Sequence, residues 1–140
     1  MSSENFSGNP GCKIPFSDSY VVEIPLKLPS CNTYINECRR NRYAAAKFKA
    51  DLERDISVYL AKLPHFEKPI KIHFLWIEEN KRRDLDGISF GKKFILDAMV
   101  KVGVLTDDNR RYVTAFTDTF AYGKKARVIM TIEEIEEVIG

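Results

Sequence analysis

The feature that most constrains the fold of this chain is a change in the spacing of its apolar residues along the sequence. Between Ile70 and Ile77 every second residue is apolar on one face, a period of two that is typical of a β-strand. Between Asn36 and Leu63 apolar residues recur at steps of three and four, which is typical of one face of a long helix. The presence of both periods in one chain predicts that it forms strands and helices, and that these pack on one another.

The same two periods give the order of elements along the rest of the chain. Pro64 ends the first helix, and Gly103 suits the carboxyl end of a second helix. We therefore expect an α+β domain with the order strand-helix-strand-helix-strand-strand, in which two helices pack on a four-stranded mixed sheet and the strand from Ile70 is central. The remaining elements are expected at 20–26, a strand; 87–102, a helix; and 112–119 and 127–133, two strands joined by a turn at 122–125.

The chain of 140 residues fits one domain, which we assign to residues 19–140. Residues 1–18 carry Ser, Gly, Asn and Pro without apolar periodicity, and we interpret them as a loose N-terminal arm. Three cysteines without a CxxC pair favour neither a disulfide framework nor a zinc site. No apolar run approaches the roughly 18 residues that span a bilayer, so we expect a cytoplasmic protein with no membrane partner.

The charge of the chain is unevenly distributed. The formal net charge is +2, from 22 basic and 20 acidic residues, but four acids lie together in 133–137. Without those four, 16 acidic residues stand against the 22 basic ones, so the body of the chain is basic. A basic body suits a phosphate-rich partner, and an ordinary surface with an acidic end is the other interpretation.

Two pairs of aspartates carry the chemical signal of this sequence. Asp84 and Asp86 directly follow a strand, so an extended backbone there would project both carboxylates to the same side. Two close carboxylates repel one another, and a divalent cation such as magnesium relieves that repulsion while substrate phosphate completes its shell. Asp107 and Asp108 lie in the loop after the second helix, which we expect to return to the same edge of the sheet.

Each pair also has an ordinary structural interpretation. Asp84 or Asp86 could cap the second helix, and Asp107-Asp108 could form a turn. An Asp-x-Asp sequence by itself is common. The functional interpretation therefore depends on the whole string of strand, basic turn, Asp-x-Asp, amphipathic helix and Asp-Asp.

Basic residues accompany these acids. Lys93 follows Asp86 by seven residues, so on one helix it would face the acids and stabilise charge that develops on a phosphate; an exposed pair with Asp97 four residues later is the alternative. Arg39 and Arg40 lie in the early turns of the first helix and either contact DNA or form a solvated face. The bases expected to hold a phosphate backbone around the acids are Lys81, Arg82, Arg83, Arg110 and Arg111.

The strings at 82–86, 93–99, 103–105 and 107–108 together resemble the RusA-type Holliday junction resolvases. The resemblance covers about residues 70–133, with a weaker similarity at Ser30, Asn32 and Tyr34. It implies a homodimeric endonuclease of phage or prophage type that uses magnesium, or manganese in its place. It further implies that the enzyme nicks two opposed strands of a four-way DNA junction during recombination and repair.

The resemblance also assigns roles to residues. It places the essential, metal-binding acids at Asp84, Asp86 and Asp108, the assisting lysine at Lys93, and an acid of less settled role at Asp107.

The chain departs from that family at two points. Gly87 stands where the family usually has asparagine, and it offers no side chain to support a metal ligand. The stretch from Asp86 to Lys93 is longer than in the shortest members, which leaves Lys92 as an alternative to Lys93. Other functions remain open: a nuclease of other branched or flapped DNA, a DNA-binding accessory protein with weak or no catalysis, or an unrelated small binding module.

Overall fold

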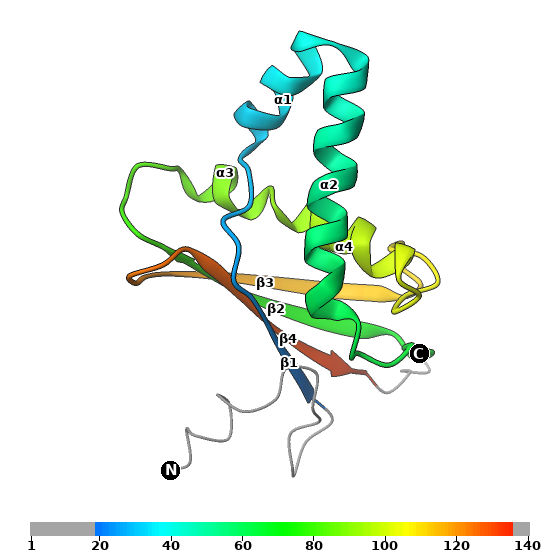
Figure 1. The fold of residues 1–140 in the computed structure, drawn as a ribbon. Coiled ribbons are helices and arrows are strands. Elements are labelled where there is room, and N and C mark those ends of the chain that lie inside the picture. The colour runs from blue at the N-terminus through cyan, green and yellow to red at the C-terminus, as the bar shows by residue number, and fades with distance from the viewer. Residues whose placement is uncertain (1–18, 136–140) are drawn as a thin grey trace.

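The structure is a computed structural model, and it describes residues 19–135 of the chain. In these residues one face of a four-stranded sheet carries the helices (Figure 1). The arm expected at 1–18 and the last two clustered acids, Glu136 and Glu137, lie outside these residues. The strands are β1 (Ser19–Ile24), β2 (Ile70–Glu78), β3 (Val113–Tyr122) and β4 (Arg127–Glu134). The helices are α1 (Cys31–Arg40), α2 (Arg42–Leu60), α3 (Leu85–Ser89) and α4 (Lys92–Lys101).

The strands lie in the order β1-β4-β2-β3, which confirms the predicted α+β fold and the central position of β2. β4 is antiparallel to both β1 and β2, whereas β2 and β3 are parallel. Because β2 lies between β3 and β4, these two strands do not form a hairpin, although only residues 123–126 connect them. The connection passes the end of β2, where the Gly123 amide donates a hydrogen bond to the Glu78 carbonyl at 2.9 Å.

The first helical region is two helices, so the prediction of one helix at 36–63 is wrong. Asn41 has an extended backbone (φ −174°, ψ 166°), and its side chain accepts a hydrogen bond from the Ala44 amide at 2.7 Å. Ser30 caps α1 in the same way by accepting from the Thr33 amide at 3.3 Å. A capping side chain offers the first amides of a helix the partner they lack, so Asn41 ends one helix and begins the next.

The second helical region is also divided, into α3 and α4, where one helix at 87–102 was predicted. Gly91 lies at the junction and is buried; a Cβ atom there would lie 2.8 Å from the Cβ of Leu28. The segment before α1 therefore passes against this junction so closely that only glycine fits. Gly103 follows α4 with φ +83°, which confirms the predicted glycine at the end of this helix.

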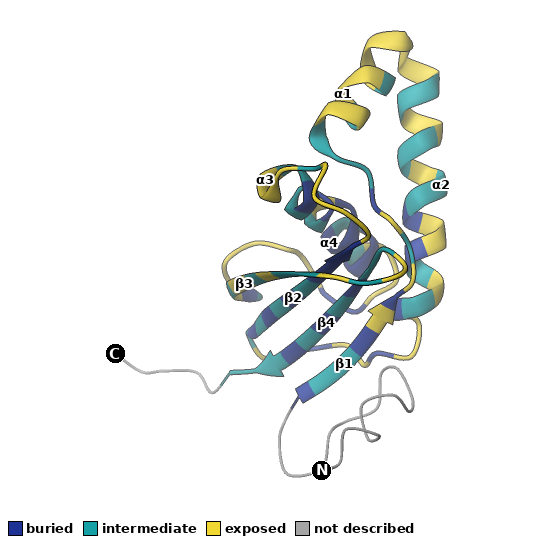
Figure 2. Ribbon diagram, turned by 90° about the vertical axis from the view of Figure 1, so that its left-hand side faces the viewer, coloured by how far each residue is buried: buried dark blue, intermediate teal, exposed yellow. Residues whose placement is uncertain are grey.

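The core lies between the sheet and the helices (Figure 2). Alternate residues of β2 face the helices and are buried, as the period of two predicts. α4 packs beside α2 and contributes the largest group of buried helical side chains. This packing fixes the end of β2 and the start of α3, where the Asp-x-Asp sequence lies. The core includes Leu28, Trp76, Ile88 and Phe94 from the neighbouring segments.

Candidate functional site

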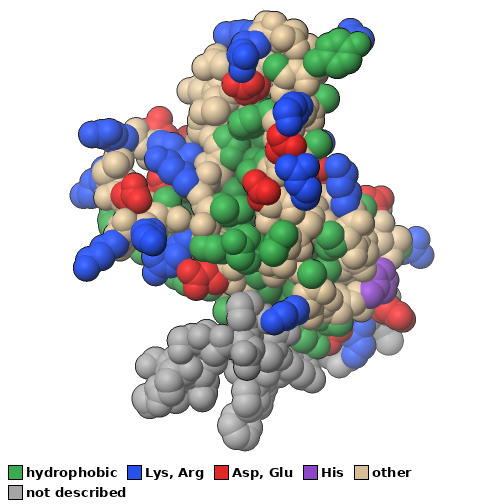
Figure 3. Space-filling view, in the orientation of Figure 1, with side chains coloured by type: hydrophobic (Ala, Val, Ile, Leu, Met, Phe, Trp, Pro, Cys, Tyr) green, Lys and Arg blue, Asp and Glu red, His purple; other side chains and the backbone are tan. Residues whose placement is uncertain are grey.

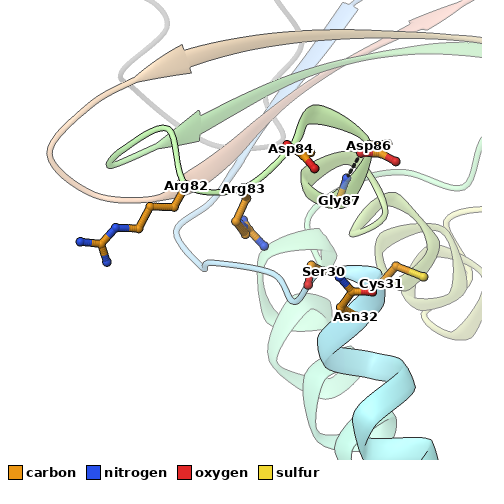
Figure 4. Close-up of a pocket in the computed structure, with 8 residues that line it drawn as sticks. All are labelled: Ser30, Cys31, Asn32, Arg82, Arg83, Asp84, Asp86 and Gly87. Carbon is orange, nitrogen blue, oxygen red and sulfur yellow. Dashed lines mark hydrogen bonds between the residues drawn. The ribbon is translucent and has the colours of Figure 1, made fainter.

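A pocket of about 380 Å³ lies between the start of α1 and the start of α3 (Figure 4). The loop that leaves β2 forms one wall, and the first residues of the two helices form the others. Both predicted acids of the Asp-x-Asp sequence are among its lining residues. These are Ser30, Cys31, Asn32, Arg82, Arg83, Asp84, Asp86 and Gly87.

Asp84 occupies the N-cap position of α3 with an extended backbone (φ −72°, ψ 156°), but its side chain makes no capping hydrogen bond. Among residues 19–135 its carboxylate has no hydrogen-bond or ion-pair partner, and the residue is exposed. The capping interpretation thus describes the position of Asp84 but not its bonding. Its two carboxylate oxygens are free to bind a ligand.

Asp86 lies in the first turn of α3, and its Oδ1 accepts a hydrogen bond from the Gly87 amide at 2.9 Å. An extended backbone from Asp84 to Asp86, the condition for both carboxylates to project to one side, is not met, because α3 begins at Leu85. Figure 4 shows the two carboxylates side by side along the start of α3, pointing in different directions.

Asp107 and Asp108 lie at the opposite end of the sheet, which corrects the expectation that they return to the same edge. Because β2 and β3 are parallel, with Ile70 beside Val113, α3 and α4 carry the chain back to the start of β2 before β3 begins. The ten residues of β3 span about 33 Å at ~3.3 Å per residue. No group of three or more His, Cys, Asp or Glu side chains in residues 19–135 is placed to hold a metal ion.

The two acids of this loop differ in what their carboxylates do. Asp107 Oδ1 accepts from the Asp108 amide at 2.8 Å, and Asp107 Oδ2 accepts from Asn109 Nδ2 at 3.1 Å, so Asp107 holds the turn. The Asp108 carboxylate has no partner among the described residues. The turn interpretation therefore fits Asp107, while Asp108 keeps a free carboxylate.

Lys93 does not contact the Asp-x-Asp sequence in this structure. Its Nζ lies 4.0 Å from Asp97 Oδ2, the i,i+4 pair that was the alternative interpretation. Asp97 also pairs with Lys49 of α2 at 3.1 Å, and this hydrogen bond raises the pKa of Lys49. Lys93 thus belongs to a series of charges between α2 and α4.

Lys92, the alternative lysine, is directed to β3. Its Nζ lies 2.8 Å from Asp118 Oδ2 and 4.6 Å from the centre of the Phe116 ring. Trp76 Nε1 donates to the other oxygen of Asp118 at 2.9 Å. We did not foresee Asp118, because an acid inside a strand gives no local signal of the tryptophan and lysine that neutralise it.

Arg82 and Arg83 are neighbours with different surroundings. Arg83 is 19% exposed and forms a two-pronged ion pair with Glu78, 8% exposed, at 3.1 and 2.6 Å. It also donates to the Leu28 carbonyl at 2.8 Å, so it joins the loop to the segment before α1. Arg82 is exposed and points away from the pocket into solvent (Figure 4). Of these two, only Arg82 has a guanidinium group available to a DNA phosphate.

The other predicted bases lie in three places, and all are exposed. Lys81 lies over the Tyr122 ring, 5.6 Å from its centre, at the pocket end of the sheet. Figure 3 shows lysine and arginine side chains gathered at this end and along α1 and α2. Arg39 and Arg40 close α1, where Arg40 pairs with Glu37 at 3.0 Å. Arg110 and Arg111 lie in the distant Asp107–Asp108 loop.

Comparisons of this chain with models of known protein families and with curated protein sequences find no match. The helices within residues 19–135 include none with the length and hydrophobicity required to cross a membrane.

Proposed function

We propose that this protein is a magnesium-dependent endonuclease that nicks four-way DNA junctions, as a homodimer, in recombination and repair. The observation that carries the proposal is the pair of aspartates, Asp84 and Asp86, on one pocket beside the exposed Arg82. The Asp84 carboxylate and Oδ2 of Asp86 have no partner among the described residues.

The donor set fits a divalent cation. Magnesium is commonly bound by one or two carboxylates, several waters and the phosphate of the substrate, and manganese accepts the same oxygens. Asp84 and Asp86 would hold the ion through their free oxygens. When bound, it supplies positive charge to the phosphate and a more acidic water. Arg82 and Lys81 would attract the DNA backbone to the pocket by charge alone.

The third acid that the resemblance implies, Asp108, is too distant to join Asp84 within one chain. A second copy of the chain can supply it, because a twofold axis that brings opposite ends of two copies together creates two equivalent sites. Each site would take Asp84 and Asp86 from one chain and Asp108 from the other. Two such sites suit a substrate that is cut on two opposed strands. The assisting role of Lys93 is proposed on the resemblance alone.

The direct test incubates the protein with a labelled four-way junction, a flap and a linear duplex, with magnesium, with manganese and with neither. We expect paired nicks in the junction only when a divalent ion is present. Equal cutting of the flap would instead favour the broader nuclease of branched DNA. Cutting in the presence of a chelator would contradict the metal-dependent site.

A DNA-binding accessory protein is the second candidate. The separation of the two acidic pairs within one chain, and the pairing of Lys93 with Asp97, favour it. Tight binding to the junction without any cutting, in both magnesium and manganese, would support this alternative over the nuclease.

A further inference from the structure

β3 is an edge strand of ten residues, Val113–Tyr122, and no strand within residues 19–135 pairs with its outer side. Its sequence, VTAFTDTFAY, contains no proline, lysine or arginine. Natural edge strands are usually kept short, or interrupted by such residues, because their free amides and carbonyls can pair with another chain. A long, uninterrupted edge therefore points to a partner that pairs with it.

The side chains of β3 suit a partner that is another copy of itself. Phe116 and Tyr122 are 41% and 57% exposed, and they lie on the face of the sheet that carries the helices. Asp118 is the one charged residue of the strand, and Lys92 neutralises it within the same chain. Two copies of β3 can therefore approach without repulsion between like charges, and each would cover apolar area of the other.

We propose that β3 pairs in the antiparallel sense with β3 of a second copy, so that two four-stranded sheets form one continuous sheet. This inference rests on the homodimer of the proposed function and identifies its interface. Residues opposite one another in an antiparallel pair lie on the same face of the sheet, so the twofold axis passes between one residue and its own copy. Near the middle of β3 that residue is Thr117. Each strand then gives its free backbone groups the hydrogen bonds that they lack.

The pairing has a consequence for the acids. In an antiparallel pair the start of one β3 lies beside the end of the other. The partner's 107–112 loop, which precedes β3, is thereby carried to the end of the joined sheet where Lys81 and Asp84 lie. The arrangement removes most of the 33 Å (about ten residues at ~3.3 Å each) that separates the two acidic pairs in one chain.

The test uses charge at the twofold axis. Thr117 is exposed and contacts His73, and Thr131 flanks the same histidine from the interior strand β4. Thr117→Lys places two like charges at the axis, and so does Thr117→Glu, whereas Thr131→Lys adds the same charge away from it. Light scattering without DNA should show dimers for wild type and Thr131→Lys, and monomers for each Thr117 variant alone. An equal mixture of the two Thr117 variants should return to dimers.

Two results would overturn the pairing: Thr117 variants that stay dimeric by themselves, or a mixture that stays monomeric. In case a variant unfolds, amide hydrogen exchange of wild type across 113–122 gives a second measurement. Protection of these amides that does not rise with protein concentration would also overturn it. A dimer insensitive to Thr117 that still cuts junctions would reject the interface while leaving the proposed function intact. Monomeric Thr117→Lys with full cutting would support the interface and reject the need for a dimer.

Discussion

The two acidic pairs lie at opposite ends of the sheet, yet in each pair the carboxylate of one aspartate accepts hydrogen bonds from neighbouring residues and the other carboxylate accepts none. In the loop before β3, Asp107 uses both carboxylate oxygens to hold a turn, which leaves the Asp108 carboxylate free. At the start of α3, Asp86 uses one oxygen on the Gly87 amide, and Asp84 uses none. In each pair one acid holds the local backbone and the other has a fully free carboxylate, so the two aspartates of a pair are not interchangeable.

The largest effect is expected from Asp84→Asn, which keeps the shape of the side chain and removes its charge. Cleavage of a four-way junction should fall by about 10³-fold, the scale of losing a group that supports charge in a transition state. Junction affinity in magnesium-free buffer should hold or rise, because a carboxylate repels phosphate until a cation lies between them. A variant that cuts at the wild-type rate would remove Asp84 from the site.

The next largest effect concerns the loop that supports the pocket. Arg83→Leu leaves the buried Glu78 carboxylate without its partner and should lower the free energy of unfolding by about 3 kcal/mol, measured by urea denaturation. Arg82→Ala is the matched control, with a change below about 0.5 kcal/mol. DNA binding should instead be affected more by Arg82→Ala. This variant should reduce, by about 0.9, the steepness with which the logarithm of the binding constant falls against the logarithm of the salt concentration. Equal stability of the two variants would contradict the different roles assigned to these neighbours.

A smaller effect distinguishes the two glycines near the pocket. Gly91→Ala forces its Cβ against Leu28 and should destabilise the fold by about 2 kcal/mol. Gly87→Ala places a Cβ 3.7 Å from Ser30, an ordinary contact, and should stabilise α3 by about 0.5 kcal/mol. Thermal melting of both variants checks the signs. A neutral Gly91→Ala would show that the junction of α3 and α4 can move away from Leu28.

The smallest effect on cutting is expected at Asp107. Asp107→Ala removes two hydrogen bonds from an exposed turn and should cost about 1 kcal/mol of stability. Cleavage should change by less than about tenfold, whereas Asp108→Asn should lose cleavage on the scale of Asp84→Asn. Stronger loss of cutting in Asp107→Ala than in Asp108→Asn, at equal folded fraction, would reverse the assignment within this pair.

The sequence predicted the elements whose signal is local. β2 and its buried face follow from alternation over eight residues, and Gly103 follows from its position after a helix. The break at Asn41 was missed because an asparagine within an apolar period of three to four can sit on the solvent face or act as a cap. The boundaries of α3 and α4 depend on Leu28, which is distant in sequence.

The candidate site was predicted only in part for a related reason. Asp84 and Asp86 share a pocket because they follow one strand, and this much is local. The placement of Asp107 and Asp108 depends on whether β3 runs parallel to β2, which no spacing within the sequence states. The ion pair of Arg83 with Glu78 was also missed, since a basic run gives no indication of which member turns inward.

The measurement that tests the central claim most directly mixes two inactive chains. Asp84→Asn and Asp108→Asn proteins are each assayed alone and after subunit exchange, with a labelled four-way junction and magnesium. If the two acidic pairs form one site between two chains, the mixed dimer contains one intact set of acids, and nicking should reappear in up to about half of the dimers. If all the acids act within one chain, or Asp108 has no part in the site, the exchanged mixture will cut no faster than the two variants measured separately.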